Sequence, residues 1–365
     1  MIYKLLLSLA FVSVAATQVF PAEDWERVDK PESIGYSSEK LIALRAWLKA
    51  GNTTAMMVSV GGQSLFEYGD LKLVSKTASV RKSILAMLYA KRFASGKIDV
   101  NRTVKDLGLD DVEPFLPIER RATLYDLVTA RSGIYLRSHK EEDPGERLLP
   151  KRGAYPPGMN FFYHNWDFNA AGTAFEKLTG LDIHDALETD LARPIGMQDF
   201  NRQRQKKVSE MPVSVHPEYA MYLSTRDMAR LGLLMLRGGQ WRGKEVIPSF
   251  GIREIVKLVT PYRDMSPASW SSLAKPGRWG YGIMWWVWDA PVWNGPVSGP
   301  FQGAFAARGA NGQFIVVLPL LEMVVAHKVD IDQTSEREVT LHEFQTILQM
   351  LVAANCGQTN RECWQ

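Results

Sequence analysis

The amino-acid sequence predicts an α+β fold in which one antiparallel sheet, built from both chain ends and flanked by helices, receives a mainly helical lobe as an insertion. Two observations support this prediction. Strand-like runs cluster near both ends of the 365-residue chain, whereas helical patterns dominate the stretch between them. The length is sufficient for one large domain or two modest ones.

The N-terminal part of the chain predicts a helix followed by a hairpin. Apolar residues recur at helical spacing from Ser38 onwards, and this pattern stops before Gly51. Strand-like runs follow at 55–60 and 64–68, on either side of a glycine pair at 61–62 that suits a hairpin turn.

The middle and C-terminal parts complete the predicted topology. Helical patterns in the middle lie at 79–93, 124–130, 169–178, 183–191 and 225–236. Near the C-terminus, strand-like runs lie at 282–288, 304–308, 313–318 and 323–327, before a closing helix over about 336–352. We therefore predict a sheet lobe (30–70 and 275–352), a helical lobe (71–274) and a C-terminal tail (353–365), with the chemistry where the two lobes meet.

Composition and motifs argue against several classes of function. The 43 Lys and Arg residues nearly balance the 40 Asp and Glu residues, so no nucleic-acid partner is expected. The sequence lacks H-E-x-x-H, paired C-x-x-C and G-x-S-x-G motifs, so we expect no metal, no cofactor and no common α/β-hydrolase arrangement. Residues 238–244 match most of a phosphate-binding loop, but Glu245 stands where a Ser or Thr would hold magnesium. We interpret that segment as a surface turn.

The first residues are typical of a signal peptide. Lys4 precedes an apolar run at 5–16, and the small residues at 14–16 suit signal peptidase. We expect cleavage near Ala16, with Ala22 as a second option and an uncleaved anchor as the alternative. The mature protein is then expected in the periplasm or secreted, without a stable membrane span.

The only two cysteines, Cys356 and Cys363, lie in the final ten residues. In an oxidising compartment we expect them to pair. Such a bridge closes only a short terminal loop, so we assign it no catalytic role.

The motif S-x-x-K occurs three times, beginning at Ser37, Ser79 and Ser272. For catalysis the serine must begin a helix, with the lysine one turn later on the same face. Only Ser79 leads into a long apolar helical pattern, which would bury the surroundings of its lysine, Lys82. Because burial lowers the pKa of a lysine, a neutral amine could then accept the serine proton near neutral pH. Taken alone, the pair could equally be a helix N-cap and a surface lysine; Ser37 is better interpreted as an N-cap.

A second element, Tyr163-His164-Asn165, introduces another helical pattern. With it, the chain resembles the serine beta-lactamase and penicillin-binding-protein superfamily, in its class C-like branch of esterases, amidases and D-aminopeptidases. The first motif of that superfamily is similar to Ser79-Val80-Arg81-Lys82, and the second, Y-x-N, is similar to residues 163–165. Supporting stretches lie at 96–99, 124–133 and 223–229. The resemblance covers about residues 30–352 and implies a beta-lactamase/transpeptidase-like fold.

The third motif departs from that superfamily. Where its beta-lactamases carry K-T-G or H-x-G on a strand, this chain has Ala307-Arg308-Gly309, followed by Ala310. The cationic or imidazole side chain at the first position is lost, which puts recognition of a beta-lactam carboxylate in doubt. Arg308 could supply a positive charge if its side chain faces the cleft, and Gly309 still allows the strand to approach a substrate closely.

The resemblance also implies a role for each residue of the motifs. Ser79 is expected to be the nucleophile, and Lys82 together with Tyr163 to relay its proton to the leaving group before water hydrolyses the acyl-enzyme. Asn165 is expected to hold Lys82 and to hydrogen-bond the substrate. The backbone N–H groups of Ser79 and Ala310 are expected to form the oxyanion hole. From the residues alone, Tyr163 could equally be a buried aromatic and Asn165 a helix N-cap.

Several neighbouring residues receive no catalytic assignment. We interpret His164 as a loop side chain and Asp167 as a charge at the start of a helix. Trp286 and Trp288 alternate onto one face of a predicted strand while Trp285 takes the other. They are expected either to pack between sheet and helices or to form an aromatic wall around an apolar substrate group.

Three functions are compatible with these patterns. The leading one is an exported serine hydrolase that cleaves a small-molecule ester or amide, short aminohexanoate amides being one option, through an acyl-enzyme on Ser79. The second is a penicillin-binding enzyme or D-amino-acid peptidase that acts on peptidoglycan, and the third is a catalytically silent binding scaffold. The complete first and second motifs favour an enzyme; the sequence does not indicate the oligomeric state.

Overall fold

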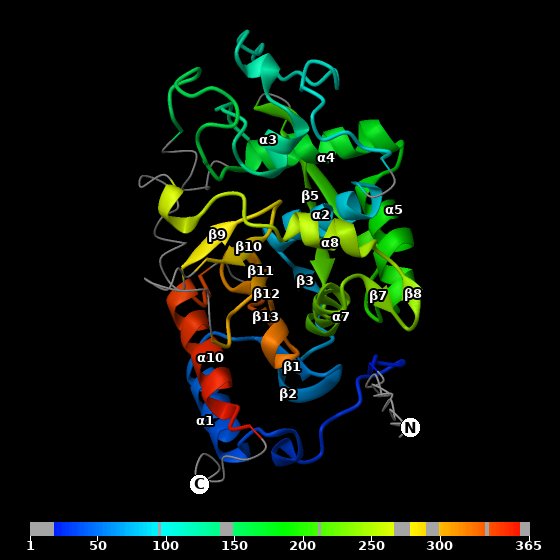
Figure 1. Ribbon diagram of the computed structural model, residues 1–365, viewed down its shortest axis with the longest axis vertical. Coiled ribbons are helices and arrows are strands. Elements are labelled where there is room, and N and C mark those ends of the chain that lie inside the picture. The colour runs from blue at the N-terminus through cyan, green and yellow to red at the C-terminus, as the bar shows by residue number, and fades with distance from the viewer. Residues whose placement is uncertain are drawn as a thin grey trace, which may run out of the picture.

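The computed structural model describes residues 18–93, 96–138, 149–210, 213–265, 278–289, 299–332 and 336–357 (Figure 1). The expected signal peptide at 1–16, Ser272 and Cys363 lie outside these residues. Cys356 is disulfide-bonded. None of the helices in the described residues has the length and apolar character that a membrane span requires.

Seven strands in the described part of the chain form one antiparallel sheet of order β2-β1-β13-β12-β11-β10-β9. Their bounds are β1 (Ala55–Val60), β2 (Gln63–Gly69), β9 (Trp279–Tyr281), β10 (Trp286–Trp288), β11 (Phe305–Gly309), β12 (Gln313–Leu318) and β13 (Met323–Lys328). β1 pairs with β13, with Ala55 opposite Lys328. The prediction that both chain ends build one antiparallel sheet is therefore confirmed.

Helices cover both faces of this sheet (Figure 1). On one face, α10 (Leu341–Ala354) packs beside α1 (Ser38–Ala50), and its Phe344 ring stacks on Phe314 of β12 at 3.9 Å between centroids. On the other face, α7 (Thr225–Leu236) packs closely at Gly232, because a Cβ there would come within 2.4 Å of Val324 and 2.9 Å of Ile315. These contacts assign alternate residues of β12 and β13 to opposite faces.

The remaining helices lie in the middle of the chain. They are α2 (Val80–Phe93), α3 (Leu124–Val128), α4 (Asn165–Thr179), α5 (Ile183–Leu187), α6 (Arg193–Ile195) and α8 (Ser249–Ile255). Short 3₁₀ turns lie at Pro31–Ile34, Glu119–Arg121, Arg202–Arg204, Tyr262–Asp264 and Pro319–Leu321. The predicted helices are present, but α4 begins four positions earlier than expected, and the helix predicted at 183–191 passes into a π-helical turn at Glu188–Ala192.

Within the residues that the structure describes, three small two-stranded sheets accompany these helices. They are β3 (Ser75–Lys76) with β6 (Tyr222–Leu223), β4 (Lys206–Glu210) with β5 (Ser214–Ala220), and β7 (Gln240–Trp241) with β8 (Lys244–Glu245). Residues 238–244, which match most of a phosphate-binding loop, lead into the β7–β8 hairpin and form its turn. The interpretation of this segment as a turn is therefore confirmed. The division of the chain into a sheet lobe and a helical lobe stays a prediction.

The strand predicted at 282–288 is wrong in its first half. Residues 282–285 form a turn in which Met284 adopts a φ of +55°, and the Gly282 N–H donates to the carbonyl of Trp285. The strand β9 ends before this turn and β10 begins after it. The closing helix also begins later than predicted, at Leu341, because Thr340 and Glu343 form a capping box there.

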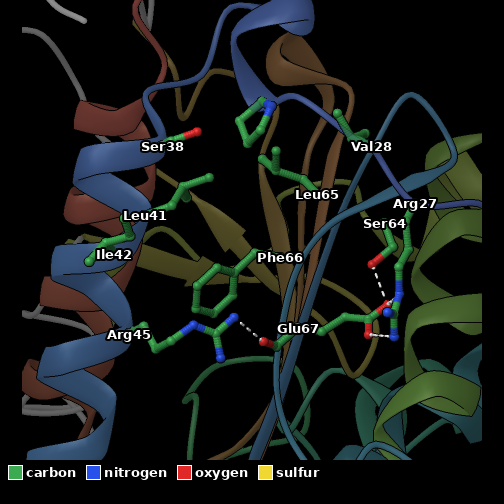
Figure 2. Close-up of a pocket in the computed structure, with 11 residues that line it drawn as sticks. Arg27, Val28, Ser38, Leu41, Ile42, Arg45, Ser64, Leu65, Phe66 and Glu67 are labelled. Atoms are coloured by element: carbon green, nitrogen blue, oxygen red, sulfur yellow. Dashed lines mark hydrogen bonds and ion pairs between the residues drawn. The ribbon is translucent and has the colours of Figure 1, made fainter. Parts of the chain in front are cut away.

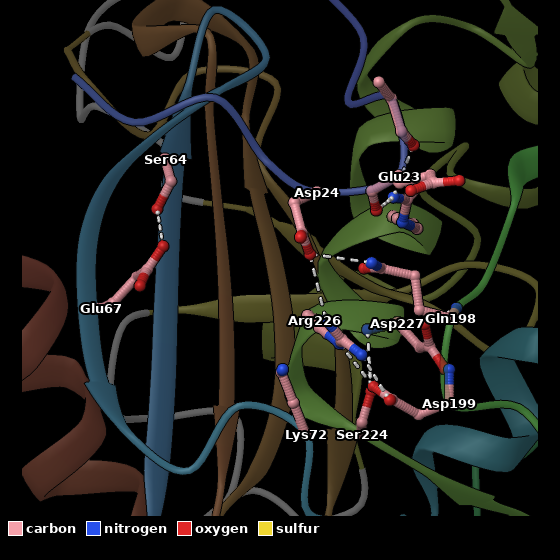
Figure 3. A network of polar contacts seen from close by, with 12 residues as sticks. Glu23, Asp24, Ser64, Glu67, Lys72, Gln198, Asp199, Ser224, Arg226 and Asp227 are labelled. Atoms are coloured by element: carbon pink, nitrogen blue, oxygen red, sulfur yellow. Dashed lines mark hydrogen bonds and ion pairs between the residues drawn. The ribbon is translucent and has the colours of Figure 1, made fainter.

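Residues 18–30 cross from the sheet to α7 (Figure 3). At the sheet, the Val28 N–H donates to the carbonyl of Ser64. At α7, Arg230 donates to the carbonyls of residues 22 and 23. Arg226 pairs with Asp24 through one terminal nitrogen. Its Nε and its other terminal nitrogen donate to the carboxylate of Asp199. The segment therefore links the outer strand of the sheet to a helix of the middle part.

A hollow of about 510 Å³ lies between α1, β2 and residues 27–31 (Figure 2). Inside it, the Arg45 guanidinium lies 4.8 Å from the Phe66 ring centroid and donates to the carbonyl of Glu67. Arg27 forms an ion pair with the Glu67 carboxylate at the rim. None of the predicted catalytic residues lines this hollow.

Candidate active site

The candidate nucleophile stands at a sharp turn between β3 and α2. Thr77 is anchored at the end of β3, where its N–H and its hydroxyl both donate to the carbonyl of Met221, at 2.9 Å each. Ala78 then adopts a φ of +47°, a left-handed conformation that costs free energy in a residue other than glycine. Ser79 follows directly before the first helical residue, Val80.

The amine, hydroxyl and phenol predicted to act together do converge. Lys82 Nζ lies 3.0 Å from Ser79 Oγ and 2.9 Å from Tyr163 Oη, and it donates a hydrogen bond to each. Lys82 is 1% exposed and Tyr163 is 6% exposed, whereas Ser79 is half-buried. The serine is therefore the member of the group that remains within reach of a substrate.

Aromatic rings enclose the amine. Lys82 Nζ lies 4.3 Å from the centroid of the Tyr163 ring and 4.6 Å from that of Phe168. On the outer side, Tyr281 and Trp286 pack against Tyr163 at 5.9 and 5.8 Å between centroids. Trp286 is buried in this contact, so the structure favours packing over a substrate-facing wall for this residue.

The start of α2 is fixed by polar contacts that motif reasoning missed. Ser83 Oγ donates to the carbonyl of Met284 at 2.6 Å, and Trp285 Nε1 donates to the carbonyl of Ser83 at 3.2 Å. Arg81 donates to Asn169 at 2.9 Å and stacks on the ring of Tyr219. The only sequence signal for these anchors is a polar residue on either side of Lys82.

The strand β11 lies against the nucleophile at Gly309. A Cβ built there would come within 2.6 Å of the Thr77 carbonyl oxygen and 3.1 Å of the Ser79 nitrogen. A side chain would therefore push the strand away from Ser79, and glycine allows the close approach that was expected. Ala310 follows at the exposed end of the strand, and Asn165 is the half-buried first residue of α4.

Arg308 does not face Ser79. Its guanidinium lies between Trp279 and Trp286, at 4.6 and 4.9 Å from their ring centroids. It lines a small void with Ala306, which residues of α10 close from the other side. Burial lowers the pKa of Arg308 to about 9. The idea that it supplies a positive charge to the cleft is therefore wrong, because adjacent residues of a strand point to opposite faces.

His164 and Asp167 belong to a buried network beside Tyr163. The Asp167 carboxylate accepts a hydrogen bond of 2.5 Å from Ser132 Oγ and lies 3.4 Å from His164 Nε2. Burial raises the pKa of the Asp167 carboxyl, and His164 acts in the opposite direction. His164 precedes α4 and Asp167 lies in its first turn, as interpreted. Both side chains are nevertheless 1% exposed, so they belong to a buried network rather than to a solvated loop and helix end.

No group of three or more His, Cys, Asp or Glu side chains among the described residues is arranged to hold a metal ion.

Comparisons with known proteins agree with the fold. The family model described as Beta-lactamase matches residues 46–342. A putative 6-aminohexanoate-dimer hydrolase from Bacillus anthracis has a similar structure, with a TM-score of 0.62, 19% identity, and coverage of 91% of this chain and 86% of that one. A beta-lactamase from Mycobacterium bovis is similar with a TM-score of 0.58, 16% identity, and coverage of 86% and 99%.

A sequence comparison gives a shorter match. An uncharacterised protein of Alkalihalophilus pseudofirmus is 29% identical over 105 residues, and this match spans 28% of each chain.

Proposed function

The chain belongs to the beta-lactamase family, whose members are serine hydrolases, and we propose that it hydrolyses a small-molecule ester or amide through an acyl-enzyme on Ser79. One observation carries this proposal: a buried lysine amine bridges a half-buried serine hydroxyl and a phenol, at 3.0 and 2.9 Å. Nucleophile, base and second proton carrier within hydrogen-bond reach are what acyl transfer requires.

The proposed reaction proceeds in two steps. Ser79 Oγ attacks the carbonyl carbon, and its proton passes to the Lys82–Tyr163 pair; the bond to the leaving group then breaks, and the leaving group receives that proton. Water, deprotonated by the same pair, attacks the acyl-enzyme, releases the acid and restores the serine hydroxyl. Burial of Lys82 supports this role, because desolvation favours the neutral amine.

Two backbone N–H groups are proposed to stabilise the oxyanion. They belong to Ser79, at the start of α2, and to Ala310, directly after Gly309. The position of Gly309 supports this pairing, since a Cβ added there would lie only 3.1 Å from the Ser79 nitrogen, which brings the end of β11 beside the nucleophile. Loss of one such donor typically slows acyl transfer by about 100- to 1,000-fold. Asn165 is proposed to hold Lys82 and to hydrogen-bond the substrate, from the first turn of α4.

Export to the periplasm or the medium is part of this proposal. It is supported by the signal-like pattern at 1–16 and by the disulfide of Cys356, a bond typical of oxidising compartments. We propose that the partner of the protein is its small-molecule substrate.

A fluorophosphonate probe tests the nucleophile. The wild-type protein is expected to become labelled, and Ser79→Ala is expected to abolish labelling while its thermal melt stays nearly unchanged. Ser37→Ala is a matched control, because Ser37 begins another S-x-x-K motif but caps α1; it should label normally. Labelling that persists in Ser79→Ala rejects the assignment of the nucleophile.

A second measurement separates the proposed hydrolase from a penicillin-binding enzyme. Purified protein is incubated with short-chain nitrophenyl esters and, separately, with a fluorescent penicillin. Turnover of the esters without a stable penicillin adduct supports the proposal. A long-lived penicillin adduct without ester turnover favours an enzyme directed at peptidoglycan, and neither signal favours a silent scaffold.

A further inference from the structure

We propose that residues 281–286, the turn between β9 and β10 with its two flanking residues, set the distance between Lys82 and Tyr163, and that Ser83 is the positioning residue through which they do so. This role rests on the proposed function, because it concerns the proton relay of the same site. The 281–286 turn contacts both members of that relay. Its middle holds α2 next to Lys82, and its two ends pack on Tyr163.

Two hydrogen bonds join the 281–286 turn to Ser83, the residue after Lys82. Ser83 Oγ donates to the carbonyl of Met284 at 2.6 Å, and Trp285 Nε1 donates to the carbonyl of Ser83 at 3.2 Å. Ser83 is 2% exposed and Trp285 is fully buried, and hydrogen bonds in such surroundings are stronger than those in contact with water. Because Ser83 and Lys82 share a peptide bond, fixing Ser83 limits the movement of Lys82.

The two ends of the 281–286 turn hold the phenol. Tyr281 packs edge-to-face on Tyr163 at 5.9 Å between ring centroids, and Trp286 packs on it at 5.8 Å. Tyr281 and Trp286 are paired across β9 and β10 and contact each other at 5.1 Å. The ring of Tyr163 therefore rests on the same hairpin that holds Ser83.

The 281–286 turn is itself anchored on three elements. The Met284 N–H donates to the carbonyl of Val128 in α3 at 3.1 Å, and the preceding N–H donates to the carbonyl of Ile255 in α8 at 3.0 Å. The Trp285 ring packs on Phe305 of β11 at 5.5 Å. Met284 has a φ of +55°, and such a costly conformation persists only where the surroundings fix it; it is common at functional sites. A turn held on three sides is a firm support for the relay.

The distance between Lys82 and Tyr163 influences the pH at which the pair loses a proton. Nζ and Oη are 2.9 Å apart, and groups this close titrate as a unit. An ammonium beside the phenol stabilises a phenolate, so the pair loses its first proton more easily. Ser79 can give its proton only to the deprotonated pair. A larger distance therefore raises the apparent pKa of the pair, and kcat/KM increases only at higher pH.

Other titratable groups lie around the pair. They belong to β5, β9, β11, α2 and the start of α4, and they are Glu218, Tyr219, Tyr281, Arg308, Arg81, His164 and Asp167. Burial raises the pKa of the Asp167 carboxyl and holds the pKa of Tyr281 well above its ordinary value of 10. A substitution of Ser83 removes none of these groups, so a shift in the pH profile reports on the distance within the pair.

Ser83→Ala removes the shorter of the two hydrogen bonds. The test measures kcat/KM for nitrophenyl butyrate across the pH range in which the protein is folded, in wild type and in this variant. The ascending limb is expected to move upwards by about one pH unit. Activity on the acid side then falls by about tenfold and approaches the wild-type value at higher pH. A limb at the wild-type position, or an equal fall at every pH, overturns the inference.

Tyr89→Phe is the matched control. Tyr89 Oη donates to the carbonyl of Ala171 at 2.7 Å from the same helix, α2, and Tyr89 is fully buried. This variant also loses a buried hydrogen bond of α2, so its thermal melt should fall as that of Ser83→Ala does. Its ascending limb should stay at the wild-type position. An equal shift of the limb in both variants would assign the effect to any loosening of α2 and contradict the inference.

Two further variants keep the result decisive. Trp285→Phe removes the other hydrogen bond to Ser83 and retains a ring beside Phe305, so it replaces Ser83→Ala if that variant fails to fold; an unshifted limb there contradicts the inference. Ester hydrolysis that survives in Ser79→Ala rejects the proposed function itself. Hydrolysis that is lost in Ser79→Ala, together with identical pH profiles for wild type and Ser83→Ala, rejects only the role of the 281–286 turn.

Discussion

At the residue scale, the site depends on a small number of buried polar contacts. Lys82 makes two of them, and its burial among the rings of Tyr163 and Phe168 excludes water from the proton path. Beside it, Asp167 joins Ser132 to His164. Ser132 follows α3, whereas His164 is the residue after Tyr163, so this carboxylate ties the tyrosine segment to a separate loop.

Removing that carboxylate is expected to destabilise the protein. Asp167→Ala leaves the Ser132 hydroxyl and the His164 ring without their acceptor in a buried space, and a loss of about 2–4 kcal/mol in the free energy of unfolding is expected. Urea unfolding at pH 7 measures it. Because the Tyr163 segment loses an anchor, the rate of fluorophosphonate labelling should fall as well.

A control for this substitution is Asp185→Ala. Asp185 also lies near a helix start and pairs with Arg202, but its side chain is 57% exposed. Exposed ion pairs contribute at most about 1 kcal/mol, so the control should resemble wild type. Equal stability of the two variants would contradict a structural role for the Asp167 network.

The sequence was informative about some of these residues and silent about others. Ser79 and Lys82 were predictable because residues three apart share one face of a helix, whereas Tyr163 was predictable only through the Y-x-N motif of the superfamily that the chain resembles. The role of Asp167 was not, since its partner Ser132 lies 35 positions away. The direction of Arg308 depended on which face of β11 meets Ser79, and only the packing of α7 and α10 on the sheet decides that.

At the element scale, the important feature is the contact between β11 and the start of α2. The strand reaches the nucleophile because residue 309 has no side chain. Elsewhere in the sheet, the prediction at 282–288 failed because alternation of apolar residues does not reveal a left-handed turn. Met284 adopts that conformation, and its N–H donates to the carbonyl of Val128, so a contact with a distant segment fixes the turn.

Gly309→Ala tests the contact between β11 and α2. The new methyl group would lie 2.6 Å from a backbone oxygen of Thr77, so the strand must retreat. We expect kcat/KM for a neutral ester to fall by about 100-fold, as for loss of one oxyanion donor, and stability to fall by about 1–3 kcal/mol. Steady-state kinetics and urea unfolding measure the two effects.

Gly51→Ala is the matched control for that substitution. At Gly51 an added Cβ meets only atoms at 3.8 Å or more, with an ordinary φ of −103°. Activity should be unchanged there. Full activity of Gly309→Ala would show that β11 does not supply the oxyanion hole.

At the scale of the whole molecule, buried histidines make stability depend on pH. Burial lowers the pKa of His184, His216 and His327 to about 4 each. In the unfolded chain a histidine takes up its proton near pH 6.5. As the pH falls from 6.5 towards 4, the unfolded chain therefore binds more protons than the folded protein, and stability is lost. Asp227, whose pKa burial raises to about 6, acts with the opposite sign.

His327 provides the cleanest measurement of this effect. Its Nδ1 donates to the carbonyl of Gly312 at 2.7 Å, and its Nε2 lies 2.9 Å from the Thr53 hydroxyl. As the pH falls from 7 to 5, His327 should lower the free energy of unfolding of the wild-type protein by about 2 kcal/mol. His327→Asn keeps a hydrogen-bond donor but does not titrate. The free energy of unfolding of this variant should therefore fall by about 2 kcal/mol less than that of the wild type between pH 7 and pH 5. Identical losses in both proteins would reject the assignment.

Because the sheet joins the two ends of the chain, its assembly depends on the order in which the polypeptide emerges from the ribosome. Thr53 and His327 form one hydrogen bond although they are 274 positions apart in the sequence. Contacts between residues so distant in the sequence raise the contact order, and a high contact order is typical of slow folding. The β1–β2 hairpin must wait with one edge unpaired until β13 has been synthesised. During that interval this edge of β1 is open to pairing with other nascent chains.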